Sequence, residues 1–176
     1  MKMTLEEMMC AWQNGDEEAF TSLYEALSPS LYAFVFRYTR EEPFSLDIVH
    51  DAFEQLCKAK NDYDVRKGTV KSYVFQIAYR QMVNKLNRRK RLRRFLPFLV
   101  PQREYNFSYE EKTVVQEAIS QLSEKHRAVI LLTYYENLTQ QEIAQVLQIE
   151  VGTVKSRLHR AKQQLKRWLE EDEDDR

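Results

Sequence analysis

The stretch "LTQQEIAQVLQIEVGTVKSRLHRAKQQL", residues 138–165, decides the fold class of this chain. Thr139 and Glu142 have the spacing of a capping box, in which the hydroxyl accepts from the third helical amide and the carboxylate accepts from the cap amide. Leu138 and Ile143 can pack together at the same helix start. The pattern predicts a short helix that begins at 139 and ends in a turn at "QIE", 148–150.

A second helix is expected directly after this turn, over 151–168. Its inner stripe has the spacing i, i+4, i+7, i+11 and consists of Val154, Leu158, Ala161 and Leu165. Its outer face carries Lys155, Ser156, His159, Arg160 and Gln163. A capped short helix, a tight turn and a second helix together predict a helix-turn-helix.

The charge of the second helix indicates what it binds. Residues 152–167 hold seven Lys, Arg or His side chains and no acid. A cationic, hydrogen-bonding face of this width suits the major groove of DNA. The plain alternative is a solvated surface helix, which is the ordinary role of Lys and Arg. The absence of acids, the position of Gly152 beside the turn and the capped preceding helix favour DNA binding.

The remaining sequence predicts an all-α protein. Its 176 residues include three Gly and four Pro, are 43% hydrophobic, and are rich in strong helix formers. Helices are expected over 16–27, restarting at Ser28 as a cap and Pro29 as first residue, and then over 45–59 and 69–92. Pro97, Pro101 and the polar residues after them predict a linker. We expect two small helical domains joined by a linker, with these bounds: 1–94, linker 95–112, helix-turn-helix domain 113–169, acidic tail 170–176.

Charge is segregated along a chain whose formal net charge is zero. Residues 1–56 carry three basic and eleven acidic side chains, whereas residues 57–103 carry fourteen and two. The terminal "EEDEDD", 170–175, has two interpretations. It is either a frayed, solubilising tail, which we favour, or a weak DNA mimic that folds back on the basic helix.

Several classes of function are disfavoured by the sequence. Cys10 and Cys57 lie far apart without metal-ligand spacing, so neither a disulfide framework nor a metal site is expected. No phosphate-binding glycine loop and no plausible nucleophile–base set is visible, so we expect neither a cofactor nor an enzyme. The sequence "MKMTLEEMMCAW" lacks the apolar core of a signal peptide, and no run is long enough to span a membrane. We expect a cytoplasmic protein.

The motif "GTVKSRLHRAK" within this helix-turn-helix resembles region four of bacterial RNA polymerase sigma factors of the extracytoplasmic-function (ECF) type. The resemblance implies that Lys155, Ser156, His159 and Arg160 read the minus-35 promoter element. It also implies that Thr139 and Arg157 contact phosphates. The family often has glycine and proline where this chain has Gln148 and Glu150.

The N-terminal half is similar to region two of the same family. "SLDIVHDAFEQL", 45–56, resembles its polymerase-binding helix and matches it at Asp47, Val49, Asp51 and Phe53. The implied role is docking on the clamp coiled coil of the largest polymerase subunit. The outward residues would be Asp47, His50, Asp51 and Glu54.

A third motif, "VKSYVFQIAYRQMVNKLNRRKR", 70–91, resembles the family's promoter-melting helix. Arg80 stands where relatives have an asparagine that helps to hold an extruded base. The minus-10 and phosphate-contacting residues implied by this resemblance are Tyr63, Tyr73, Tyr79, Arg80, Lys85, Arg88 and Arg89. For the tyrosines, burial in the core is at least as well supported by the sequence as stacking on a base.

Taken together, the resemblance implies an ECF-type sigma factor that binds core RNA polymerase and promoter DNA. An anti-sigma factor is an implied further partner, and direct membrane insertion is not expected. The alternative is a stand-alone helix-turn-helix regulator that binds operator DNA without polymerase.

Overall fold

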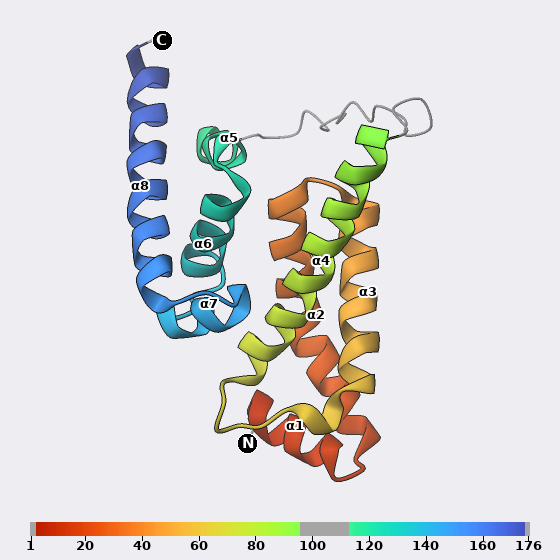
Figure 1. The fold of residues 1–176 in the computed structure, drawn as a ribbon. Helices are drawn as coiled ribbons and strands as arrows, with labels where there is room; N and C mark the ends of the chain where they lie inside the picture. The colour runs from red at the N-terminus through yellow and green to blue at the C-terminus, as the bar shows by residue number, and fades with distance from the viewer. Residues whose placement is uncertain (1–2, 96–112, 175–176) are drawn as a thin grey trace.

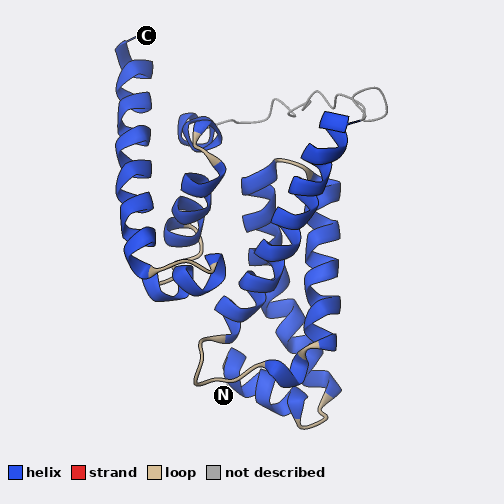
Figure 2. Cartoon of the chain, in the orientation of Figure 1, coloured by secondary structure: helices blue, strands red, loops and turns tan. Residues whose placement is uncertain are grey.

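A computed structural model describes residues 3–95 and 113–174, and within these ranges it contains helices and no strand (Figures 1 and 2). The all-α prediction is confirmed. The elements are α1 (Leu5–Gln13), α2 (Glu17–Thr39), α3 (Glu42–Lys58), the 3-10 turn η1 (Lys60–Asp62), α4 (Val70–Phe95), α5 (Val114–Gln121), α6 (Glu124–Tyr134), α7 (Gln140–Leu147) and α8 (Val151–Asp174). Apart from Phe95, the predicted linker 95–112 lies outside the described residues.

The N-terminal half is a bundle of α2, α3 and α4, with α1 packed against the first part of α2 (Figure 1). Leu31 and Phe34 of α2, Ile48 of α3 and Phe75 of α4 are fully buried in it. The ring centroids of Phe34 and Phe75 lie 5.5 Å apart, a spacing typical of packed aromatic pairs. These residues form the centre of the bundle.

Helix α2 runs without interruption through Pro29, so the predicted restart at Ser28 is wrong. A proline inside a helix removes one backbone hydrogen bond, here the bond to the carbonyl of Glu25. Pro29 is exposed, so water can reach that carbonyl, while Leu27 and Leu31 on the opposite side are buried. The burial of the apolar stripe on both sides of the proline outweighs the local loss.

The hydrophobic periodicity of the sequence did not predict helix α1. Its start has the same capping box as the helix at 139: Thr4 Oγ1 accepts from Glu7 N (3.2 Å), and Thr4 N donates to Glu7 Oε2 (2.7 Å). Met9 and Trp12 are buried against the bundle. The T-x-x-E spacing at 4–7 was a sequence signal sufficient to locate this helix.

The C-terminal half contains the predicted helix-turn-helix. Thr139 and Glu142 form the capping box at the start of α7, and Leu138 and Ile143 are both buried. Gln148 ends α7 in the left-handed region at φ 54°, so the turn forms without the glycine that such positions favour. Helix α8 then extends to Asp174, beyond the predicted end at 168, so its helical backbone continues into the acidic segment 170–174.

The two halves pack against each other and share one hydrophobic cluster, which the sequence did not predict. Helix α6 lies between α8 on one side and α2 on the other, and α7 lies on α4 (Figure 1). The five consecutive residues 128–132 of α6 are therefore all buried. A helix with one packing face would bury only about every third or fourth residue.

Arg127 of α6 connects the ends of three helices. Its guanidinium donates to the carbonyl of Tyr38 near the end of α2 (2.8 Å), and to those of Ser120 (2.6 Å) and Leu122 (3.0 Å) at the end of α5. The Tyr38 hydroxyl in turn donates to the carbonyl of Glu124 (3.3 Å). The cation thus satisfies carbonyls at helix ends that have no partner within their own helices.

Glu136 is a charged residue buried at the junction of the halves, with only 4% of its surface exposed. Lys71 Nζ of α4 lies 3.2 Å from its Oε2 and donates to its carbonyl oxygen (2.8 Å). Burial raises the pKa of the Glu136 carboxyl above its usual value, and the Lys71 charge only partly opposes this rise. The ion pair therefore does not fully offset the cost of burying the carboxylate.

Substitutions in α2 test whether it is one helix or two. Pro29→Ala should raise the free energy of unfolding by about 1–3 kcal/mol, because it restores a helical hydrogen bond. Ser28→Ala should change it by less than about 0.5 kcal/mol, whereas removal of a true N-cap costs about 1 kcal/mol. Urea denaturation measures both. A loss near the N-cap value for Ser28→Ala would favour two helices.

Glu136→Gln should remove part of the pH dependence of stability. Since the folded state raises the pKa of Glu136, it binds this proton more tightly than the unfolded chain does, and its stability falls as the pH rises through the raised pKa. The free energy of unfolding of the unmodified protein should therefore decline relative to that of the variant as pH increases from about 4.5. Denaturation at a series of pH values measures the difference. Glu25→Gln, on the exposed side of α2, controls for loss of charge. If the pH dependence of the free energy of unfolding were the same in Glu136→Gln as in the unmodified protein, Glu136 would not have a raised pKa in the folded state.

Candidate nucleic-acid interface

The outer face of α8 carries four of the predicted minus-35 residues, and all four are exposed: Lys155, Ser156, His159 and Arg160. Val154, Leu158 and Ala161 hold the opposite side of the helix against α6 and α7. The backbone N–H of Ile149 donates to the carbonyl of Ala144 (3.0 Å) and fixes the turn before α8. The fold therefore presents a continuous cationic, hydrogen-bonding face on a helix supported from behind.

Two other predicted minus-35 residues lie in different settings. Arg157 is half-buried and close enough to Tyr79 of α4 to lower the pKa of that hydroxyl, although burial raises it more. The Thr139 hydroxyl donates to Glu142 Oε2 (2.8 Å) and accepts from Glu142 N (3.2 Å). Arg157 is thus directed toward the junction of the halves, and Thr139 is engaged in the helix cap.

A groove of about 470 Å³ lies between α3 and α4 in the N-terminal half, and we call it the α3–α4 groove. Tyr73 and Arg80, both predicted to contact the minus-10 element, line it together. The other lining residues are Gln55, Ala59, Asp62, Gln76, Ile77, Gln81 and Asn84. Such a concave surface combines one aromatic ring, one cation and several amides, which suits the stacking and edge recognition of an unpaired base.

The amides of this groove were not singled out from the sequence. Gln76, Gln81 and Asn84 lie on the same side of α4 as Tyr73 and Arg80, at helical spacing from them. That spacing was visible in the sequence, but the wall formed by α3 and η1 was not. Only the folded bundle shows which side of α4 borders the groove.

The other predicted aromatic residues are divided between two sides of α4. The Tyr63 ring lies 5.5 Å from the Tyr73 ring at the end of the groove, and its hydroxyl donates to the carbonyl of Gly68 (3.1 Å). Burial, with the charges of Glu6 and Asp64, raises the pKa of Tyr63 to about 12, so this donor stays protonated at neutral pH. Tyr79 instead packs edge-on against Tyr38, 6.4 Å away, and does not line the groove.

The predicted phosphate contacts at the end of α4 also differ from one another. Lys85 Nζ pairs with Asp47 (2.5 Å) and Asp51 (2.6 Å) of α3. Burial lowers the pKa of Lys85, but the hydrogen bonds and charges of the two aspartates outweigh it, so the pKa lies above its ordinary value. Arg88, by contrast, is exposed.

Arg89 is engaged within the bundle. Its guanidinium pairs with Glu41 Oε2 (2.9 Å) and lies 4.2 Å from the centroid of the Phe44 ring. These contacts fix the guanidinium plane against the start of α3. Of the three predicted cations in the second half of α4 (Lys85, Arg88 and Arg89), Lys85 and Arg89 are thus already paired with acids of the same chain.

The predicted polymerase-binding residues lie on one side of α3. Asp47, His50 and Glu54 are exposed, and Asp51 is half-buried beside Lys85. Glu54 pairs with Lys58 (2.5 Å), and this hydrogen bond lowers the pKa of the Glu54 carboxyl. Leu46, 56% exposed, adds an apolar side chain to this acidic face.

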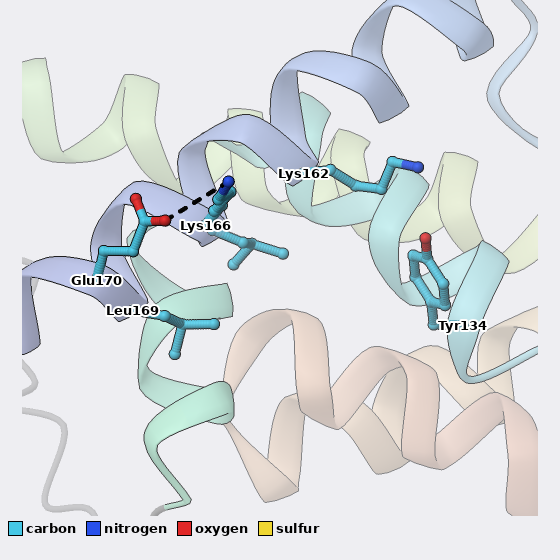
Figure 3. A pocket seen from close by; sticks show the side chains of 6 residues that line it. Tyr134, Lys162, Lys166, Leu169 and Glu170 are labelled. Carbon is cyan, nitrogen blue, oxygen red and sulfur yellow. Dashed lines mark ion pairs between the residues drawn. The ribbon is translucent and has the colours of Figure 1, made fainter. Parts of the chain in front are cut away.

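An apolar groove of about 410 Å³ runs between the end of α6 and the second half of α8 (Figure 3). It is lined by Tyr134, Lys162, Leu165, Lys166, Leu169 and Glu170. Lys166 Nζ and Glu170 Oε1 lie 3.6 Å apart on its open rim. These side chains supply no nucleophile–base pair, so the lining of this groove does not constitute an active site.

Within residues 3–95 and 113–174, no three His, Cys, Asp or Glu side chains gather closely enough to hold a metal ion. Cys10 and Cys57 are exposed free thiols. No helix in these ranges is both long and apolar enough to cross a bilayer.

Comparison with known proteins identifies the chain. Two family models match it: "Sigma-70 region 2" over residues 23–92 and "Sigma-70, region 4" over residues 112–165. The first match contains α3, α4 and the groove between them, and the second contains the helix-turn-helix. The chain belongs to the sigma-70 family.

Full-length relatives define the group within this family. The ECF RNA polymerase sigma factor SigW of Bacillus subtilis is 25% identical, and the match covers 96% of this chain and 98% of SigW. The ECF RNA polymerase sigma factor SigK of a Mycobacterium species (strain KMS) is 24% identical over 88% of this chain and 84% of SigK. The chain is an RNA polymerase sigma factor of the ECF type, and a stand-alone operator-binding regulator is not favoured.

Solved structures have the same fold. The sigma factor RpoE from Bartonella quintana, in complex with the anti-sigma factor NepR, matches with a TM-score of 0.72 and 20% identity, over 86% of this chain and 96% of RpoE. CnrH, in complex with the cytosolic domain of CnrY, matches with a TM-score of 0.71 and 23% identity, over 94% and 96%. At these identities the likeness establishes the fold.

Salt dependence should separate the two kinds of cation on α4. Arg88→Gln should reduce the slope of log K against log salt for single-stranded DNA by about 0.7, the value for one phosphate contact. Lys85→Gln should leave the slope nearly unchanged, because Asp47 and Asp51 already neutralise Lys85. Fluorescence anisotropy with a labelled oligonucleotide over a series of salt concentrations gives both slopes. Equal reductions would show that Lys85 leaves its aspartates to bind phosphate.

Proposed function

We propose that this sigma factor uses three separate surfaces in promoter recognition. The outer face of α8 reads duplex DNA at the upstream element, the α3–α4 groove holds an unpaired base of the downstream element, and the acidic face of α3 docks on core RNA polymerase. The observation that carries the proposal is the exposed row of Lys155, Ser156, His159 and Arg160 on a helix whose other side is buried.

Each surface suits its partner chemically. Lysine, arginine and serine side chains donate to the acceptors of base edges in the major groove. The α3–α4 groove, which exposed Arg80 and half-buried Tyr73 line together, combines a cation for phosphate with a surface for stacking. Exposed Asp47, His50 and Glu54 around Leu46 combine charge complementarity with an apolar contact.

The energetics of strand opening require the polymerase. Separating a DNA duplex costs about 1.4 kcal/mol per base-pair step. Stacking one released base on an aromatic side chain returns about 1–3 kcal/mol. One groove offsets only part of the cost of even a short bubble, so the sigma factor traps an opening that the polymerase helps to create.

The proposal extends to domain boundaries, partners and chemistry. Residues 1–94 and 113–169 form the two DNA-binding domains, joined by 95–112 and followed by the acidic segment 170–176. The chain itself is not an enzyme, since RNA synthesis belongs to the polymerase, and it acts in the bacterial cytoplasm. An anti-sigma factor is a further partner, as it is for the Bartonella RpoE with which this chain shares its fold.

Run-off transcription with purified core polymerase over a promoter library tests the proposal directly. Addition of the protein should produce transcripts from a defined subset of promoters. Association with the polymerase but no selective initiation would contradict the assignment of α8.

Within this assay, Arg160→Ala should relax the preference for upstream sequence while leaving polymerase affinity intact. The loss of one good base contact should cost about 1–3 kcal/mol in discrimination. Arg167→Ala, an exposed cation two turns further along α8, is the matched control and should leave the preference unchanged. If Arg160→Ala reduced promoter choice and polymerase binding equally, Arg160 would not be a residue that specifically reads the upstream element.

A further inference from the structure

Two side chains of opposite charge line the α3–α4 groove. Asp62 comes from η1 and Arg80 comes from α4, and the other described residues that line the groove are uncharged. Both side chains are exposed, and neither forms an ion pair or a side-chain hydrogen bond with another described residue. An acid and a base that share a groove without pairing leave their hydrogen-bonding groups available to a ligand.

The two charges lie at different places along the groove. Asp62, Tyr73 and Gln76 also border a cavity of about 220 Å³ beside the loop that precedes α4, and Arg80 does not line this cavity. Arg80 follows Tyr73 by two helical turns, a rise of about 10 Å along the axis of α4. Asp62 thus lies at the end of the groove that contains the Tyr73 ring, and Arg80 lies further along it.

The Tyr73 ring is held in place beside Asp62. Its hydroxyl donates to the carbonyl of Ala59 (3.4 Å), and the Tyr63 ring lies 5.5 Å away. Burial raises the pKa of the Tyr73 hydroxyl, and the Asp62 carboxylate is close enough to raise it further. A base stacked on the half-buried Tyr73 ring would therefore bring its polar edges near Asp62.

Guanine alone among the DNA bases has both kinds of edge that such a pair of charges can bind with two hydrogen bonds each. Its O6 and N7 are adjacent acceptors, to which a guanidinium donates two parallel hydrogen bonds. Its N1–H and N2–H₂ groups are adjacent donors, from which the two oxygens of a carboxylate can accept. Cytosine has adjacent acceptors but only one amino donor. Adenine and thymine alternate donors with acceptors.

The amides of the groove favour a different base. Glutamine and asparagine pair with N6 and N7 of adenine, and Gln76, Gln81 and Asn84 all line the groove. An adenine would, however, leave both Arg80 and Asp62 with incomplete hydrogen bonding. Hydrogen bonds to ionised groups are stronger than those between neutral groups, so the two charges outweigh the amides in the choice of base.

We propose that the α3–α4 groove selects guanine among unpaired bases. Arg80 donates to O6 and N7, the Asp62 carboxylate accepts from N1–H and N2–H₂, and the base stacks on Tyr73. Arg80 then binds the base edge, and the phosphates of the strand are left to exposed cations such as Arg88. This inference rests on the proposed role of the groove in holding an unpaired base of the downstream element, and it identifies that base.

Base discrimination by the full chain bound to core polymerase tests the proposal. The probes are short fluorescent oligothymidylates in which the central thymidine is kept or is replaced by deoxyguanosine, deoxyadenosine or deoxycytidine. Binding is measured by anisotropy, and core polymerase alone gives the background. The oligonucleotide with deoxyguanosine should bind at least about fivefold more tightly than the other three, the discrimination expected of one good bidentate contact. Equal affinities, or a preference for another base, would overturn the inference.

Base analogues separate the two contacts. 7-Deazaguanine lacks the N7 acceptor, and hypoxanthine lacks the N2 amino group. Arg80→Met should abolish the discrimination between guanine and 7-deazaguanine and preserve that between guanine and hypoxanthine. Asp62→Ala should have the opposite effect. A variant that kept both discriminations would show that its residue does not contact the base.

Control variants distinguish failure of this inference from failure of the proposed function. Arg88→Gln, an exposed cation of α4 that does not line the groove, should weaken all four oligonucleotides by the same factor. If Arg80→Met did the same, Arg80 would be a phosphate contact, and the guanine assignment would fail while the groove kept its proposed role. If neither Arg80→Met nor Tyr73→Leu changed the binding of any oligonucleotide, the proposed role of the groove would fail, and the inference would fail with it.

Discussion

The structure depends on the packing of α4 against two different parts of the chain at once. Its buried residues, among them Val74, Phe75 and Met82, face the bundle formed with α2 and α3, and its first turns contact α7. A third strip of the same helix lines the groove that contains Tyr73 and Arg80. One helix therefore determines the position of the groove, the stability of the N-terminal half and the placement of the helix-turn-helix.

Local sequence signals predicted the elements whose stabilising contacts are local. The capping box at Thr139 and the inner stripe of α8 depend on residues within a few turns of one another, and both predictions are confirmed. The restart at Ser28 is wrong because contacts of Leu27 and Leu31 with other helices keep α2 continuous through the proline. Helix propensity summed over a short stretch of sequence does not include contacts with distant helices.

Local sequence signals could not predict how the two halves pack against each other. Apolar stripes on α4 and all-round burial of 128–132 in α6 indicate more than one packing face, but they do not identify the partner. For the candidate sites, sequence located the faces of α8 and α3 correctly as exposed surfaces. It could not distinguish Arg88 from Lys85, because the pairing of Lys85 with two aspartates arises from side chains brought together by the fold.

The contacts of Arg127 have a consequence for the register of the helices. One planar guanidinium reaches three carbonyl oxygens, one from the end of α2 and two from the end of α5. Inserting a single residue near either end would rotate the following carbonyls by about 100° around the helix axis and move them out of its reach. The lengths of α2 and α5 are thus coupled through a cation on α6, so an insertion in one half would disturb the alignment of the other.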